Sequence, residues 1–244
     1  MTREIMVVIR KELKEIGTEG GGGRRGRLTS VIGLLVAGVL LPLNFGVRYV
    51  RPDVMAIMGM ILPLLFTLPI VADSFAGERE RHTLETLLAT RLPDKAILFG
   101  KLGAIVLYAF ALTIIALVIG VTSVNVAHPE ARPLLVAPTL LAGTLAESVL
   151  TATFIGGLGL LISLKAATVR QAQQRVSLVL FVPILIPTVV NRLPPAVTAP
   201  IRDLLTSGRL TPLQLGLAVL VVLDAAVLYV STLRFRRSRL MTVA

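Results

Sequence analysis

The sequence contains no cysteine and no tryptophan, and only 5% of its 244 residues are aromatic. The absence of cysteine excludes disulfides, thiolate nucleophiles and thiolate metal sites. The scarcity of aromatic residues argues against nucleic acid as a partner, because single-strand sites combine a basic groove with aromatic side chains that stack on bases. The formal net charge of +11 instead fits basic residues that set membrane topology and contact anionic lipid.

Charged residues are also scarce. They make up 16% of the chain, against 55% hydrophobic residues, and the mean hydropathy is +0.83. A soluble domain carries about 25% charged residues, and an apolar run of about 20 residues can cross a bilayer as a helix. We therefore predict an all-α, polytopic membrane protein with six spans, at Leu28–Val47, Val54–Phe75, Ile97–Ser123, Leu134–Ser163, Ala172–Val190 and Pro212–Leu233.

The residues before the first span predict an amphipathic helix. Ile5, Val8, Ile9, Leu13 and Ile16 recur at spacings of three and four, with charged residues on most of the other side. Such a helix lies in the membrane interface, although a solvated tail with the same periodicity is an alternative. The predicted organisation is an interfacial helix over 1–18, a glycine-rich joint over 19–27, a transmembrane domain over 28–233 and a basic tail over 234–244.

The distribution of basic residues predicts the orientation. Most of the 25 Lys and Arg residues lie in the two termini and in the second and fourth loops between spans. Cytoplasmic loops carry such an excess. We therefore expect a multi-pass protein of the plasma (inner) membrane with both termini and the second loop in the cytoplasm.

The glycine-rich joint superficially resembles a phosphate-binding loop. Gly21 and Gly26 have the required spacing, but Arg27 and Leu28 stand where the lysine and the Ser/Thr belong. The phosphate-binding motif also needs a strand before the loop. No strand is predicted before this joint, and a membrane span follows it directly. We therefore expect no nucleotide or other cofactor in this chain.

The most informative segment is the charged bridge Ser74–Lys101 between the second and third spans. Its periodicity predicts one short helix over Glu78–Arg91, with three leucines on one face and an Arg81–Glu85 pair one turn apart on the other. On physical grounds alone, an amphipathic loop helix that rests on the membrane is an equally good interpretation.

Several short motifs in and around the bridge resemble type-2 ABC transporter permeases, the membrane subunits of ABC exporters. In the bridge these are Ala76-Gly77-Glu78-Arg79-Glu80-Arg81, Thr83-Leu84-Glu85, Leu87-Leu88, Pro93 and Gly100-Lys101. Lys11-Glu12-Leu13 also resembles the N-terminal segment of that family. His82 departs from the family pattern, because a small residue or glycine is usual at its position.

The resemblance implies that the bridge is a coupling helix that docks in a cleft of a separate ATPase. The expected polar contacts are Glu78, Arg79, Glu80, Arg81 and Glu85, and the expected apolar anchor is Leu84, Leu87 and Leu88. It further implies two copies of the ATPase, which would hold ATP-Mg, and pairing with a second permease copy or a homologous permease. The permease itself would be a transport subunit and not an enzyme.

Two carboxyl groups lie near the middle of predicted spans, Glu147 in the fourth and Asp224 in the sixth. Charge inside a membrane is costly, so each marks either a cation or proton site or the lining of a transport path. The alternative is a protonated or hydrogen-bonded carboxyl that joins helices, with Ser148, Thr151 or Ser231 as partners.

Two other classes of function are alternatives to the permease. An ion-coupled secondary transporter would use Glu147 and Asp224 and need no ATPase. An intramembrane enzyme is disfavoured, because the two histidines, His82 and His128, lie in loops and no span carries a catalytic or metal-ligand set. The substrate is not predicted by any motif in the chain.

Overall fold

The structure is a computed structural model that describes residues 1–18, 31–84, 89–129, 133–178, 199 and 212–235. Across these residues the regular elements are helices, with no strand. The predicted all-α class is therefore confirmed for the described part of the chain.

Five helical segments in this part are long and apolar enough to cross a membrane. Four of them are built on α4 (Pro52–Glu80), α6 (Asp94–Ala127), α7 (Pro138–Ser163) and α10 (Pro212–Arg234). Each overlaps a predicted span. The fifth predicted span, Ala172–Val190, lies largely outside the described residues, so the count of six stays a prediction.

The first span, Val31–Val50, is less regular than the others. It contains a π-helical turn, η1 (Val36–Leu40), then α3 (Leu41–Phe45) and the 3-10 turn η2 (Gly46–Val50). Pro42 lacks a backbone N–H inside this continuous helical run, and the carbonyl of Gly38, one turn earlier, accepts the Ser123 hydroxyl at 3.2 Å.

The spans pack around two large buried apolar clusters that divide the bundle along its length, and a small alanine cluster joins α4 to the residues after α7. One cluster, which includes Phe75, Leu84 and Ile97, lies at the end of the bundle where α4 ends and α6 begins. The other, which includes Tyr49, Met55 and Met58, lies toward the opposite end, where α4 begins. The first cluster supports the candidate site described below.

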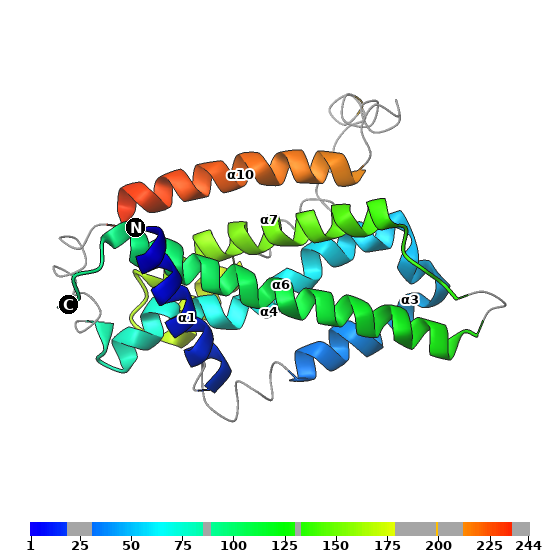
Figure 1. The fold of residues 1–244 in the computed structure, drawn as a ribbon, viewed down its shortest axis with the longest axis horizontal. Helices are drawn as coiled ribbons and strands as arrows, with labels where there is room; N and C mark the ends of the chain where they lie inside the picture. The colour runs from blue at the N-terminus through cyan, green and yellow to red at the C-terminus, as the bar shows by residue number, and fades with distance from the viewer. Residues whose placement is uncertain (19–30, 85–88, 130–132, 179–198, 200–211, 236–244) are drawn as a thin grey trace.

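An N-terminal helix, α1 (Thr2–Thr18), crosses α6 at the end of the bundle that also holds the last residues of α10 (Figure 1). Its Val8 is 3% exposed and lies directly over Gly100 of α6. The predicted apolar periodicity is thus used for packing on α6. The placement of α1 in the membrane interface stays a prediction.

Gly100 sets how closely α1 approaches α6. A methyl group at Gly100 would lie 2.5 Å from Cβ of Val8, and a branched carbon so near its own backbone cannot rotate away. Gly100→Ala should therefore displace α1 and lower the free energy of unfolding by about 1–3 kcal/mol, as overpacking does. The measurement is thermal unfolding of the purified protein in detergent.

Gly17→Ala is the matched control, since nothing lies within 4 Å of a methyl group at Gly17. It also replaces a helical glycine near the end of α1. An equal change in the unfolding temperature for both variants would contradict a tight contact between α1 and α6.

Candidate functional site

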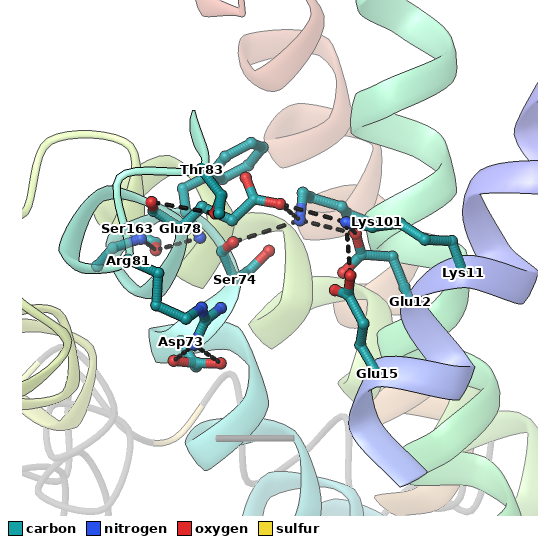
Figure 2. A network of polar contacts seen from close by, with 12 residues as sticks. Lys11, Glu12, Glu15, Asp73, Ser74, Glu78, Arg81, Thr83, Lys101 and Ser163 are labelled. Atoms are coloured by element: carbon teal, nitrogen blue, oxygen red, sulfur yellow. Dashed lines mark hydrogen bonds and ion pairs between the residues drawn. The ribbon is translucent and has the colours of Figure 1, made fainter. Parts of the chain in front are cut away.

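The candidate site is a buried ion-pair network that joins three helices (Figure 2). Its centre is Lys101 of α6, whose side chain is 1% exposed. Lys101 Nζ donates at 2.9 Å to Glu12 Oε1 of α1 and at 2.9 Å to Glu78 Oε1 of α4. It also lies 3.3 Å from the Ser74 carbonyl oxygen and 5.1 Å from the centroid of the Phe75 ring. One ammonium group therefore binds all three helices.

A second lysine extends the network toward solvent. Lys11 Nζ lies 3.0 Å from Glu15 Oε1, 3.3 Å from Glu12 Oε1 and 3.6 Å from Glu78 Oε1. Burial alone would lower the pKa of Lys11, but the three carboxylates outweigh burial and raise it. The two lysines together offset most of the negative charge that the three glutamates bring to one place.

Local sequence spacing explains why these side chains meet. Glu12 follows Val8 by one helical turn, so the residue that packs on Gly100 and the residue that binds Lys101 share one face of α1. Ser74 and Glu78 are likewise one turn apart on α4. The close contact at Gly100 is what brings Glu12 within reach of the neighbouring Lys101.

The three charges after Glu78 are bound by other parts of the chain. The Arg79 guanidinium donates to the carbonyl oxygens of Leu164, at 2.9 Å, and Ala166, just after α7. Glu80 Oε1 accepts the backbone N–H of Val169 at 2.8 Å. Arg81 lies 3.2 Å from Asp73. The start of the bridge is therefore fixed to the turn after α7 as well as to α1 and α6.

A hydroxyl group from α7 is inserted into the end of α4. Ser163 Oγ accepts the N–H groups of Phe75 and Ala76, at 3.1 and 2.9 Å, and donates to the Ala72 carbonyl at 3.2 Å. Ala76 N–H and the Ala72 carbonyl are partners in a regular α-helix, so Ser163 stands between them. The end of α4, where the bridge begins, is therefore bonded directly to α7.

The predicted helix over Glu78–Arg91 is wrong in its extent. α4 continues through Glu80, and the chain then turns at Arg81 and His82. The N–H of Thr83 bonds the Glu78 carbonyl, and the N–H of His82 bonds the Arg79 carbonyl, which is a Schellman ending with His82 at the left-handed position. The φ of His82 is +56°. Sequence periodicity missed this ending because glycine, its usual signal, is absent.

The other predicted bridge residues are placed as follows. Leu84 is 7% exposed and belongs to the apolar cluster with Phe75 and Ile97. Glu85, Leu87 and Leu88 lie outside the described residues, as does the predicted Arg81–Glu85 pair; the described partner of Arg81 is Asp73. Contact of any of these residues with an ATPase stays a prediction.

Glu147 and Asp224 do not belong to the network. Glu147 lies on α7 and is 2% exposed, and Asp224 lies on α10 and is 5% exposed. The alternative of hydrogen bonds to Ser148, Thr151 or Ser231 is not supported. The two serine hydroxyls donate to carbonyl groups of their own helices, and the Thr151 hydroxyl is buried without a partner. Within the described ranges, no group of three His, Asp or Glu side chains is arranged to hold a metal ion.

Lys101 is the residue that sequence reasoning missed. It belongs to the Gly100-Lys101 motif, and it is also the only Lys or Arg within the predicted span Ile97–Ser123. A charged residue inside an apolar run is a functional candidate by default. Its partners Glu12 and Glu78 come from distant segments. Apart from their place in the motifs that resemble the family, nothing in the sequence indicates that they pair with Lys101.

All residues of the ion-pair network lie within the region that matches a known protein family. The sequence profile of the family described as "ABC-2 type transporter" matches residues 4–192. The ABC transporter permease protein NatB of Bacillus subtilis (strain 168) is 29% identical over 138 residues, which are 52% of this chain and 36% of NatB. The matched region thus spans about a third of that relative's length.

Removal of the central ammonium should destabilise the protein strongly. Lys101→Met leaves Glu12 and Glu78 buried together without their cation, which for a buried pair costs about 3–5 kcal/mol. The change is measured as the unfolding temperature in detergent. Lys95→Met is the control, because Lys95 is an exposed residue of the same helix. Lys101→Met combined with Glu12→Gln and Glu78→Gln should recover much of the loss.

His82→Gly should stabilise the turn after α4. A non-glycine residue in the left-handed conformation costs about 1–2 kcal/mol, and part of that gain is offset because glycine has more freedom in the unfolded chain. The expected result is a small rise in the unfolding temperature, whereas His82→Val should lower it. A fall with glycine would contradict the Schellman ending.

Proposed function

The chain belongs to the ABC-2 type transporter family, whose profile matches residues 4–192, and from this premise we propose that it couples to a separate ATPase and exports a substrate. The permease subunit would span the plasma membrane with both termini in the cytoplasm. ATP-Mg would be held by the ATPase and not by this chain.

The observation that carries the proposal is the anchoring of the segment Ala76–Leu92, here called the bridge loop. Its first residues are bound to α1 and α6 through Lys101, and to the turn after α7 through Arg79 and Glu80. A force applied to the bridge loop is therefore passed to several membrane helices at once. Rigid-body movement of packed helices is a common basis for such transitions.

The burial of the bridge residues suggests which of them meet the ATPase. Glu80, Arg81, His82 and Arg91 are exposed, so we assign them to the polar contact. The resemblance adds Glu85, Leu87 and Leu88. Glu78 and Leu84 are buried within the chain, and we assign them, with Arg79, to the attachment of the bridge loop to the membrane helices.

The proposed cycle requires ATP to favour one of two permease conformations. A ligand shifts such an equilibrium only as far as its affinities for the two states differ. The bridge loop provides the point at which the ATPase could distinguish the two states, because its position is tied to α1, α4, α6 and the turn after α7. Two ATPase copies and a second permease would complete the transporter.

The second candidate from the sequence is an ion-coupled secondary transporter that uses Glu147 and Asp224. Family membership favours the ATP-driven permease over this alternative. The two carboxyl groups nonetheless need an explanation of their own, because both are buried in membrane helices.

The proposal is tested by charge reversal on the bridge loop. Glu80→Lys and Arg91→Glu should each weaken binding of the ATPase by about tenfold or more, which corresponds to about 1.4 kcal/mol. The tagged permease is purified from its own host, and the copurified ATPase is measured by mass and by ATP hydrolysis.

Arg51→Glu is the matched control, since Arg51 is exposed and precedes α4 at the opposite end of that helix. It should leave ATPase binding unchanged. Full ATPase binding and transport after replacement of the whole stretch from Glu78 to Glu85 would overturn the coupling role.

A further inference from the structure

Glu147 lies in the seam between α4, α7 and α10. A methyl group on Gly59 of α4 would lie 2.8 Å from Glu147 Oε2, and one on Gly216 of α10 would lie 3.3 Å from Oε1. The carboxyl group thus occupies space that is free because Gly59 and Gly216 have no side chain. Its Oε2 atom is buried and has no hydrogen-bond partner.

Besides Ser74 and Glu78 near the end of α4, three further polar groups in these helices have buried oxygens without a partner. They are both carboxyl oxygens of Asp224 and the hydroxyl groups of Thr67 and Thr151. Thr67 is 0% exposed and Thr151 is 4% exposed. Threonine hydroxyls in a helix usually bond a carbonyl of the preceding turn, as Thr153 does to Val149 at 2.8 Å.

Contacts between the helices show that these groups are spread over about two helical turns of the seam. α4, α7 and α10 run in the same direction. Gly59 of α4 and Gly216 of α10 lie against Glu147 of α7, and the later residues Val71 of α4 and Val227 of α10 lie against the later residues Gly159 and Gly157 of α7. Counting back from these contacts puts Thr67 level with residue 155 and Asp224 level with residue 154. Thr151 is one turn away, and Glu147 is one turn beyond Thr151.

No positive side chain of these helices reaches that depth. Between Asp53 and Asp73, α4 has no titratable residue, and α7 has only Glu147. The titratable residues of α10 other than Asp224 are Tyr229 and the terminal Arg234. After Lys101, the only titratable residue of α6 is Tyr108. The two carboxyl groups therefore have no cationic side chain beside them in the described helices.

A carboxylate cannot remain charged and unpaired in an apolar seam, because the cost of desolvation is too high. A proton would neutralise each carboxyl but would leave the threonine oxygens unused. An alkali metal ion would neutralise one carboxylate and would also be coordinated by the threonine hydroxyl oxygens. All these donors are hard oxygens, which suit such ions and not soft metals.

We propose that the seam between α4, α7 and α10 binds a monovalent cation at Glu147 with Thr151, and that Asp224, about two turns further along the seam, binds a second one. An alkali metal ion and a proton compete for each carboxyl group. This inference goes beyond the proposed function and does not depend on the bridge loop or on an ATPase.

The test uses a carbodiimide, which reacts with protonated carboxyl groups in apolar surroundings. The full-length protein in detergent is treated with dicyclohexylcarbodiimide, and modification of Glu147 and Asp224 is measured by peptide mass spectrometry. Labelling should become faster as the pH falls. At constant pH and ionic strength, sodium or potassium should slow it relative to choline.

The size of the effect follows from simple competition. At an ion concentration roughly ten times its dissociation constant, the free fraction of sites and hence the labelling rate should fall about tenfold. Thr151→Val should weaken this protection at Glu147, while Thr153→Val should not, because the Thr153 hydroxyl already bonds Val149. Glu147→Gln should leave the labelling of Asp224 in place.

The outcomes separate a binding site from a buried neutral carboxyl. A labelling rate that is the same in sodium, potassium and choline would show that a proton alone neutralises these groups and would overturn the proposal. If neither carboxyl group is labelled at any pH, the proposal is tested by equilibrium binding of a radioactive alkali ion to the purified protein. Binding to the wild type that is lost in Glu147→Gln with Asp224→Asn supports the proposal, and equal binding by the two proteins overturns it.

Discussion

The contact of one lysine with two glutamates organises the end of this bundle. Lys101 lies in α6, and its partners come from α1 and α4, so a single ammonium group fixes three helices that are distant in sequence. A buried ion pair adds little stability over a well-packed apolar contact, but loss of one partner is costly. The arrangement therefore specifies position more than it adds stability, and Gly100 makes it possible by letting α1 approach.

The same constraint gives the bridge loop a fixed base. Glu78 is held by Lys101, Arg79 and Glu80 are held by the turn after α7, and Ser163 enters the last turns of α4. The charges that the sequence suggested were free for a partner are in large part bound within the chain. What remains exposed is Glu80, the turn after it and Arg91, so Glu80 belongs both to the attachment of the bridge loop and to its proposed contact surface.

The unpartnered oxygens of the α4–α7–α10 seam contrast with this network. In the network every described charge has an opposite charge or a backbone partner nearby. In the seam, Glu147 and Asp224 have none in the described helices. Both features lie in the same bundle, and α4 and α7 contribute to each. Movement of α4 against α7 would therefore alter the seam and the bridge loop together.

The sequence by itself determined the class of fold, most of the spans and the family, because each depends on composition, on runs of apolar residues or on short local motifs. It also singled out Glu147 and Asp224, since a charge inside an apolar run is visible without a structure. The end of α4 at Glu80 was not visible, because the His82 turn lacks the usual glycine. The pairing of Lys101 with Glu12 and Glu78 was decided only by the tertiary structure, because no local pattern says which distant helices pack together.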